Sequence, residues 1–340
     1  MTKDQTAMLK GVAIMMMLFL HLFSNPSFAS EATPLLWVGD TPFATIFARA
    51  CGPVGFFLTC SGYGLAYAHL NGKLHYKDQL KRTAKLYLNY WLILFIFVGI
   101  GHFLFTNFKV GTFQTTVANV TGWDTDAYDH PAWFLLPYCI ISISSPVIFR
   151  CIDKFGIKRS LACTLILCIF SMYVISRHIA PVKAYHEWYT IIFTYFDLLF
   201  PFTFGAAICY MTKRGRVLIP FLHDRQWLVR VLVVMWFCVH CLTGSALFGT
   251  FMMCVFVVLY LNLNIQGVTR RILTELGNKS MVMWLTHAFI YGPFFHDEIY
   301  GARYPILIFL TLLIPTYLLS IPILKLSHLT TDKIPWLKRK

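Results

Sequence analysis

The sequence carries unusually little charge. Only 13% of its 340 residues are Asp, Glu, Lys or Arg, whereas 57% are hydrophobic, and the mean hydropathy is +0.62. A soluble globular domain has about a quarter of its residues charged, so this composition excludes that class. The sequence instead predicts a polytopic membrane protein.

Several catalytic and binding motifs are missing as well. The chain has no G-x-S-x-G sequence for the nucleophile elbow of an α/β-hydrolase and no glycine-rich loop for holding phosphates. A C-x-x-C sequence at Cys238 to Cys241 lacks a second pair at ligand spacing, so we expect no metal site. Internal repeats, low-complexity stretches and soluble domains are also absent. We therefore expect the chain to act through its membrane spans and short loops.

Apolar segments of membrane-spanning length recur along the whole chain. A span needs about 20 residues, and the first, seventh and ninth segments are short by that measure. The sequence predicts an all-α membrane helix bundle of about ten transmembrane helices over residues 1–330, followed by a basic tail at 331–340. The ten segments lie near residues 8–23, 44–68, 86–106, 132–149, 160–177, 190–211, 226–240, 242–262, 280–295 and 304–324.

The net charge of +14 is distributed unevenly between alternate loops. Because basic residues gather in cytosolic loops of membrane proteins, their distribution places both termini in the cytosol. A nucleic-acid-binding protein would need a basic stripe on a soluble face, which this chain lacks. The cytosolic set comprises Lys3, Lys10, Lys73 to Lys85, Arg150 to Arg159, Lys213 to Arg230, Arg270, Arg271, Lys279 and Lys333 to Lys340, and the opposite set comprises Arg49, Lys109, Arg177, Lys183 and Arg303.

A histidine inside the first apolar segment is the first candidate for chemistry. His21 follows Lys10 by eleven residues, which on a helix leaves the two side chains about 20° apart in azimuth and roughly 16 Å apart along the axis. Ionisable groups in lipid are costly, so they usually face a cavity and mark a functional path. The alternative is that His21 is a packed residue of the bundle.

Three further stretches combine polar and aromatic residues at the ends of spans or inside them. Residues 52–64 collect small residues and Ser61 in one span, which suits close helix packing or the lining of a cavity. Arg82 and Lys85 share a helix face at the start of the third span, where ordinary cytosolic anchoring is the alternative. Trp133 opens the fourth span, where a tryptophan commonly anchors the membrane interface.

Taken in order, these stretches resemble the acyltransferase type 3 family of integral membrane acyltransferases, and the resemblance covers the whole chain. Two lysines, at positions 10 and 85, stand where the family typically has arginines, so the charge is kept but the bidentate fork is lost. The matching residues are Lys10 with His21, Phe56-Phe57-Leu58-Thr59-Cys60-Ser61-Gly62-Tyr63, Arg82 with Lys85, Trp133-Phe134-Leu135, and Trp284-Leu285-Thr286-His287.

The resemblance implies transfer of an acyl group, most often acetyl, from cytosolic acetyl-CoA to a hydroxyl of a cell-surface or envelope glycan. In that reading Lys10, Lys81, Arg82 and Lys85 form a cationic mouth for the phosphates of CoA. Ser61 would donate to the thioester carbonyl, although a helix-packing serine is the alternative. The implied location is the bacterial cytoplasmic membrane, with the lipid bilayer, acyl-CoA and a glycan acceptor as partners.

Two histidines are the expected catalytic residues. His21 would act as general base toward the acceptor hydroxyl, or would carry the acyl group itself. His287 would orient the substrate or serve as a later station, with a packed, hydrogen-bonded histidine as the alternative.

Aromatic and acidic side chains are the expected acceptor-binding residues at the outer end of the bundle. Trp133 and Tyr138 would stack on a sugar ring, and Asp126, Asp124 or Asp129 would bind its hydroxyls.

A second function class, a transporter or exporter of a sugar or another small molecule, also fits about ten spans with buried ionisable residues. A structural protein of an envelope complex is a third, but it would leave the alignment of Lys10 with His21 unexplained. Binding of acetyl-CoA would separate the enzyme from both. The sequence leaves open the acceptor glycan, the choice of acetyl among short acyl groups, and the oligomeric state.

Overall fold

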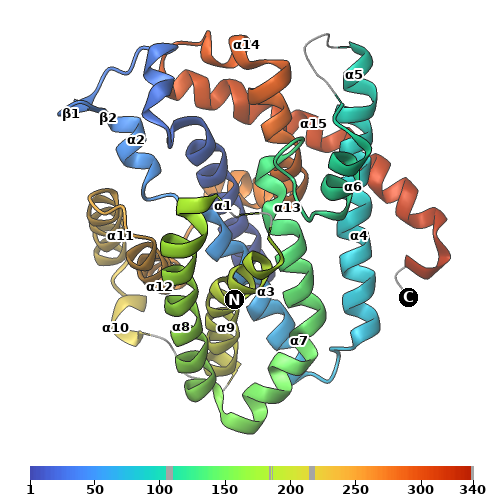
Figure 1. The fold of residues 1–340 in the computed structure, drawn as a ribbon. Helices are drawn as coiled ribbons and strands as arrows, with labels where there is room; N and C mark the ends of the chain where they lie inside the picture. The colour runs from blue at the N-terminus through green and yellow to red at the C-terminus, as the bar shows by residue number, and fades with distance from the viewer. Residues whose placement is uncertain (105–109, 184, 186, 214–218, 338–340) are drawn as a thin grey trace. The chain divides into compact units, whose positions relative to one another are not determined.

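The computed structural model describes residues 1–104, 110–183, 185, 187–213 and 219–337. Within these residues the protein is nearly all-α, as predicted, and its single sheet is a two-stranded hairpin of β1 (Trp37–Val38) and β2 (Thr41–Pro42). Figure 1 shows this hairpin beside α2. The α-helices are α1 (Lys3–Phe23), α2 (Phe43–Ala48), α3 (Pro53–Leu70), α4 (Tyr76–Leu94), α5 (Gly101–Leu104), α6 (Phe113–Thr121), α7 (Leu135–Phe155), α8 (Ile157–Val174), α9 (Trp188–Lys213), α10 (Pro220–His223), α11 (Gln226–Cys241), α12 (Ala246–Asn262), α13 (Gly267–Phe289), α14 (His296–Tyr300) and α15 (Pro305–Lys333).

Short 3₁₀ or π turns extend or join several of these helices. The π turns follow α4, α8 and α13 directly, so each of these helices continues without a loop. The turns are η1 (Pro26–Ser30), η2 (Phe95–Ile100), η3 (His130–Phe134), η4 (Ile175–Ile179), η5 (Ala180–Val182), η6 (Ile290–Phe294) and η7 (Pro335–Leu337).

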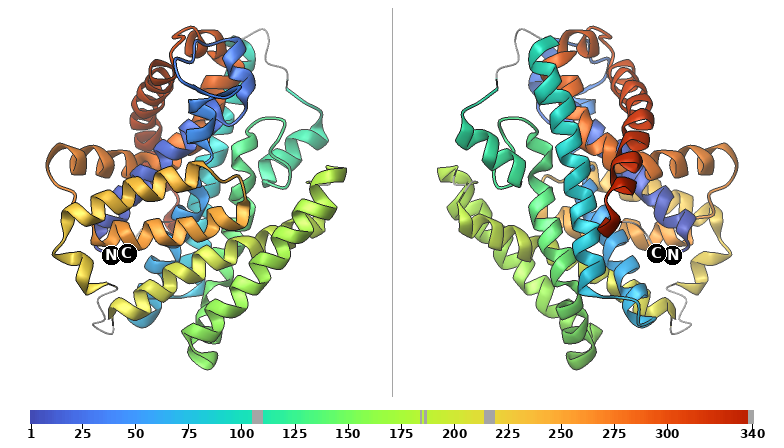
Figure 2. Two further views of the ribbon diagram at one scale, coloured as in Figure 1. Left: turned by 90° about the vertical axis from the view of Figure 1, so that its left-hand side faces the viewer. Right: turned by 90° about the vertical axis from the view of Figure 1, so that its right-hand side faces the viewer.

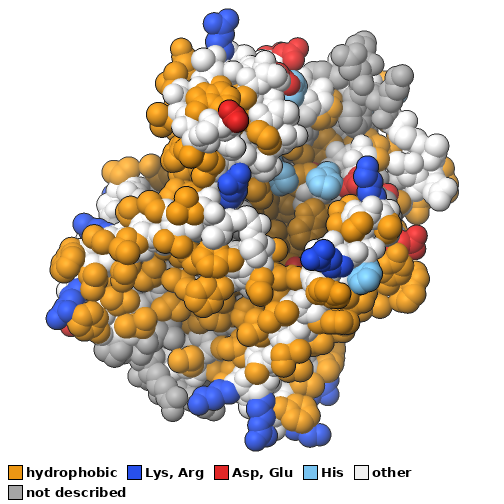
Figure 3. Space-filling model, turned by 60° about the vertical axis from the view of Figure 1, so that its left-hand side comes forward, with side chains coloured by type: hydrophobic (Ala, Val, Ile, Leu, Met, Phe, Trp, Pro, Cys, Tyr) orange, Lys and Arg blue, Asp and Glu red, His pale blue; other side chains and the backbone are white. Residues whose placement is uncertain are grey.

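Among the described residues, seven helical stretches are long and apolar enough to cross a membrane. A helix lies in the described part of each of the ten predicted segments, but α11 and α12 are shorter than a span, and α13 carries charged residues over its first half. The face in Figure 3 is covered mainly by hydrophobic side chains, as lipid contact requires. Because only seven of the ten predicted segments meet the length and hydropathy of a span over the described residues, the count of ten stays a prediction. The cytosolic location of both termini stays a prediction as well. The seven stretches are Lys3–Phe23, Phe43–Leu70, Tyr76–Leu104, His130–Phe155, Ile157–Val182, Trp188–Thr212 and Pro305–Lys333.

The chain divides into two compact units. The first comprises Met1–Ala13, Gly52–Tyr76 and Pro137–Gly277, and the second comprises Ile14–Cys51, Lys77–Leu136 and Asn278–Lys340. In the first unit α9 packs against both α3 and α8. Figures 1 and 2 show α8 and α9 as a long antiparallel pair.

Glycines allow α3 and α9 to approach each other closely in the first unit. A Cβ atom on Gly62 of α3 would collide with the backbone oxygen of Phe202, and a Cβ atom on Gly205 of α9 would collide with that of Thr59. The two glycines therefore form a reciprocal contact in which each helix backbone touches the other. This is the close packing that small residues permit in membrane helices.

We expect Gly62→Ala to destabilise the protein by about 1–3 kcal/mol, the usual cost of overpacking a well-filled core. The helices must separate because the obstacle is backbone rather than a flexible side chain. Gly64→Ala is the matched control, since nothing lies within 4 Å of a Cβ atom at that position of the same helix. Thermal unfolding in detergent should show a lower midpoint for Gly62→Ala alone, and equal midpoints for the two variants would contradict this packing.

Local signals in the second unit fix the segment that precedes α7. The Thr112 side chain caps α6 by accepting a hydrogen bond from Thr115 N, and Gly122 ends that helix with a φ of 74°, a value that favours glycine. Tyr90 of α4 donates through its hydroxyl to Asn119 O at 3.0 Å, and Tyr128 N donates to the Asn119 side chain. Residues 122–129 are thus held as an ordered, non-helical approach to η3 and α7.

Candidate functional site

The second unit brings the two predicted catalytic histidines together. His21 lies near the end of α1 and His287 near the end of α13, and their ring centroids are 5.0 Å apart. Tyr291, one helical turn beyond His287, completes the cluster, with its ring 6.5 Å from that of His21 and 5.9 Å from that of His287. His287 is fully buried, whereas His21 is partly exposed. Two imidazoles and a phenol therefore share one site.

The hydrogen bonding of His287 defines which of its nitrogens is free. Nδ1 lies 2.6 Å from the carbonyl oxygen of Trp284, and since a carbonyl only accepts, Nδ1 carries a proton and donates it. In the neutral imidazole Nε2 then holds the lone pair. Nε2 is buried and has no hydrogen-bond partner among the described residues. It is therefore free to accept a hydrogen bond from a substrate or from His21.

Trp284 also ties the histidine helix to the segment before α7. Its indole nitrogen donates to Pro131 O at 2.9 Å, and its ring packs edge-on against Phe134 at a centroid distance of 5.5 Å. The backbone of Trp284 thus orients His287 while its side chain holds η3. These two contacts bring residues 129–134 into the same unit of structure as the histidine pair.

Asp129, immediately before η3, is the most unusual side chain of the unit. It is 0% exposed, and neither carboxyl oxygen has a hydrogen-bond partner among the described residues. Burial raises the pKa of Asp129 well above its ordinary value, which favours the protonated, uncharged carboxyl. The side chains of Tyr90 and Tyr291 lie within electrostatic range of it. Asp129 therefore acts electrostatically on Tyr291, one member of the histidine cluster.

The predicted acceptor-binding residues Asp126 and Trp133 flank Asp129 in the same unit. Asp126 lies on the surface, where its carboxylate is hydrogen-bonded to Nδ1 of His130 at 2.5 Å. Trp133 is 40% exposed and packs against Phe134. His130 in turn lies within electrostatic range of His21. The acidic loop is joined to the histidine helix through the bond from Trp284 to Pro131 O.

Ser61 and Tyr138, which the sequence predicts to contact different substrates, meet in the first unit. Their hydroxyl oxygens are 3.3 Å apart, and either can be the donor. Ser61 is buried in α3, next to the glycine at which α3 touches α9. The close approach of α3 to α9 explains why position 62 is a glycine. The hydroxyl of Ser61 has the Tyr138 hydroxyl as its hydrogen-bond partner.

The four predicted CoA-binding cations are divided between the two units. Lys10 is half-buried on α1, in the part that belongs to the first unit, and α1 runs unbroken to His21 as the spacing predicted. Lys81, Arg82 and Lys85 lie half-buried on α4 in the second unit, where α4 begins at Tyr76, well before the predicted apolar segment. A common cationic mouth stays a prediction.

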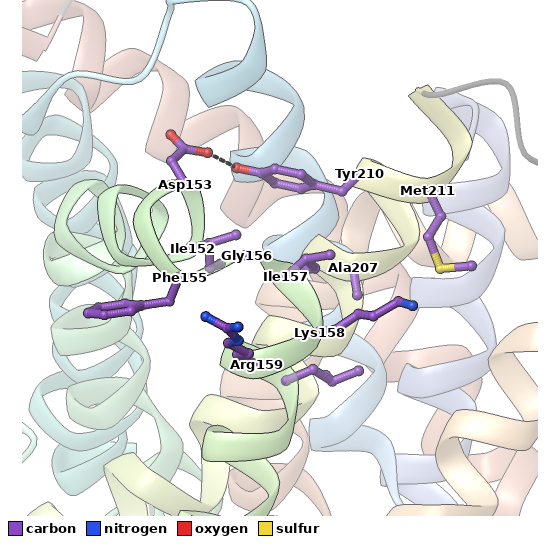
Figure 4. A pocket seen from close by; sticks show the side chains of 11 residues that line it. Ile152, Asp153, Phe155, Gly156, Ile157, Lys158, Arg159, Ala207, Tyr210 and Met211 are labelled. Carbon is purple, nitrogen blue, oxygen red and sulfur yellow. Dashed lines mark hydrogen bonds between the residues drawn. The ribbon is translucent and has the colours of Figure 1, made fainter.

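A pocket of about 470 Å³ lies in the first unit, where α7 ends, α8 begins and α9 passes. Figure 4 shows Lys158, Arg159, Asp153 and Tyr210 around it, with the Tyr210 hydroxyl donating to Asp153 at 2.8 Å. None of the predicted site residues lines it. Over the described part of the chain, no group of three His, Cys, Asp or Glu is placed to hold a metal ion.

Sequence reasoning did not single out Tyr291 or the coupling role of Trp284. The spacing of both residues points to His287, because residues three and four apart share a helix face. Trp284 lies three residues before His287, and Tyr291 lies four residues after it. Asp129 was one of three equivalent acidic candidates. Nothing in the sequence distinguished it, since only the fold buries it.

Comparison with protein families matches residues 7–325 to the acyltransferase domain of the acyltransferase type 3 family. The match covers nearly the whole chain. Searches of curated proteins and of solved structures return no significant match.

Proposed function

The chain belongs to the acyltransferase type 3 family of integral membrane acyltransferases, and from that premise we propose that it transfers an acetyl group from cytosolic acetyl-CoA to a hydroxyl of an envelope glycan. The observation that supports this proposal best is the pairing of His21 with His287 at 5.0 Å. Placing two imidazoles inside an otherwise apolar bundle costs free energy, and ionisable side chains in such places usually mark a functional path. Acyl transfer to a hydroxyl needs a base of this kind.

In the proposed reaction His21 acts as general base. Its imidazole takes the proton of the acceptor hydroxyl while the oxygen attacks the thioester carbonyl. The new C–O bond forms, the C–S bond breaks, and the CoA thiolate leaves and receives the proton from the imidazolium. His287 accepts a hydrogen bond at Nε2, the nitrogen that its bond to Trp284 leaves free, and so orients the hydroxyl or the base.

The donor site proposed for CoA uses the cations of α1 and α4. Lys81 and Lys85 are one helical turn apart and share a face, and Arg82 stands beside them, so the three cations suit the phosphates of CoA. Lys10 would add a fourth charge. Ser61, whose hydroxyl has Tyr138 as a partner, would donate to the thioester carbonyl.

The acceptor site proposed for the glycan uses the residues around η3. Trp133 presents an exposed aromatic face for stacking on a sugar ring, and Asp126 offers a carboxylate at the surface. Tyr138 is the third member of this proposed site. The acidic loops would face the outside of a bacterial cytoplasmic membrane, where envelope glycans are exposed.

The direct test is the ester-linked acetate that mild alkali releases from surface glycans of the native host. We expect deletion of the gene to remove this acetate from one glycan fraction, and complementation with the full chain to restore it. Acetate unchanged by deletion in every fraction would contradict the proposal. Binding of acetyl-CoA to the purified protein would separate the enzyme from a carrier, which has no reason to bind it.

A further inference from the structure

A buried carboxyl group without hydrogen-bond partners is rare in a folded protein. Leaving such a group unpaired costs free energy, so an exception calls for a physical reason. Asp129 is such an exception, because it is 0% exposed and both of its oxygens are unpartnered among the described residues. Its backbone is fixed at both ends, since Asp129 N donates to Thr125 O and Asp129 O accepts from Ala132 N.

Other buried polar atoms of the same unit also lack a partner among the described residues, and one of them belongs to the histidine cluster. Nε2 of His287 is also buried without a partner, and Tyr291 links the two groups, since its ring is 5.9 Å from that of His287 and its hydroxyl is within electrostatic range of Asp129. The electrostatic partners of Asp129 in this part of the structure are phenols rather than cations. The carboxyl group of Asp129 and Nε2 of His287 therefore each keep a hydrogen-bonding capacity that the described residues do not use.

We propose that Asp129 binds the acceptor substrate by hydrogen-bonding a hydroxyl next to the one that reacts at His21 and His287. This inference rests on the proposed acyl transfer to a polyhydroxylated acceptor. His130 and Trp133 are the first exposed residues after Asp129 along the chain, so the acceptor is proposed to approach from their side. Both of these flanking side chains are exposed, the His130 side chain by 67%.

An uncharged carboxylic acid suits this role because it presents one donor and one acceptor. A sugar hydroxyl offers the same pair, so the two groups can form complementary hydrogen bonds without burying a charge. Asp126, another of the three acidic candidates, is less suitable, since it lies on the surface and its carboxylate is already bonded to His130.

Two variants of Asp129 separate hydrogen bonding from shape. Asp129→Asn keeps the size of the side chain together with one donor and one acceptor, whereas Asp129→Leu keeps the approximate size but removes both. Asp297→Asn is the control, since it neutralises an exposed carboxylate on α14 of the same unit. Thermal unfolding in detergent establishes whether each full-length variant is folded.

The assay uses membranes containing each variant, radiolabelled acetyl-CoA as donor, and the alkali-treated envelope fraction of the deletion strain as acceptor. For Asp129→Leu we expect the half-saturating amount of envelope to rise at least about tenfold, the effect of losing one buried hydrogen-bonded pair, with half-saturation by acetyl-CoA unchanged. Asp129→Asn should stay within about threefold of the wild type on both measures.

The pH dependence of half-saturation by the envelope fraction is a second measurement. A purely structural role of Asp129 would leave this pH dependence the same in the wild type and in Asp129→Asn. As the pH rises through its raised pKa, Asp129 loses its proton and with it the hydrogen-bond donor. The half-saturating amount of envelope should therefore increase at high pH for the wild type, but not for Asp129→Asn. The other titratable groups of the cluster are common to both proteins and cancel in the comparison. They are Tyr90 on α4, Tyr291 on η6, His21 on α1, His287 on α13, and Asp126 and His130 on the same segment.

The outcomes distinguish this inference from the proposed function. Absence of transfer by the wild-type protein would overturn the proposed function itself. Wild-type transfer with unchanged half-saturation in Asp129→Leu would overturn the inference alone, and so would loss of transfer in a folded Asp129→Asn. If Asp129→Leu does not fold, the pH profile of Asp129→Asn decides, because a high-pH limb like that of the wild type would contradict a role for the Asp129 proton.

Discussion

Replacing His21 by alanine is expected to abolish acetyl transfer to the envelope glycan while leaving the protein folded. General base catalysis contributes about 10²–10⁴ in rate, and at the lower bound of that range alkali-released acetate would already fall to the level of the deletion strain. His21 is only partly buried at the end of α1, so its removal opens little space in the core. The measurement is ester-linked acetate at matched membrane levels of each variant.

Two further variants define the role of His21. His21→Gln should be as inactive as His21→Ala, because an amide can hydrogen-bond but cannot take a proton at working pH. His328→Ala is the matched control, since that histidine is exposed on α15, outside the cluster. Activity retained by His21→Gln would show that His21 only positions a substrate, and equal acetate from His21→Ala and the wild type would remove it from the reaction.

The sequence predicted the features that hydrophobicity and spacing control. The membrane class follows from composition. Lys10 and His21 lie on one unbroken helix, α1, which is the condition for the eleven-residue spacing to place them on one face. The start of α4 at Tyr76 lay outside such reasoning, because hydropathy locates the lipid-facing part of a helix and not its polar continuation. For the same reason the apolar segment at 280–295 belongs to a helix that begins at Gly267.

The candidate site shows where sequence reasoning ends. His21 stands out because an ionisable residue in an apolar run is unusual, and His287 was found through the family resemblance. Which of three aspartates on one loop is buried depends on packing across more than 150 residues of sequence, in particular on the bond from Trp284 to Pro131. No local pattern encodes such a contact, so Asp129 could be recognised only in the fold.

His287 offers the second large effect, and its two nitrogens can be tested separately. His287→Asn places an amide nitrogen near the position of Nδ1 and can still donate to Trp284 O, but it removes the free acceptor at Nε2. His287→Gln can place its amide oxygen near Nε2 and keeps that acceptor. If Nε2 is the working atom, His287→Asn should lose roughly 10- to 100-fold in transfer rate, since a hydrogen bond to a developing charge contributes about 1.5–3 kcal/mol.

The comparison between the two amides is what makes the result interpretable. Both variants put a neutral, hydrogen-bonding side chain into the same buried site, so a general loss of packing would affect them alike. Higher activity in His287→Gln than in His287→Asn assigns His287 a direct part through Nε2. The reverse order would mean that the bond to Trp284, and with it the placement of η3 and Asp129, is what the enzyme needs from His287. Full activity in both would leave His21 as the sole base of the reaction, because neither amide can take up a proton.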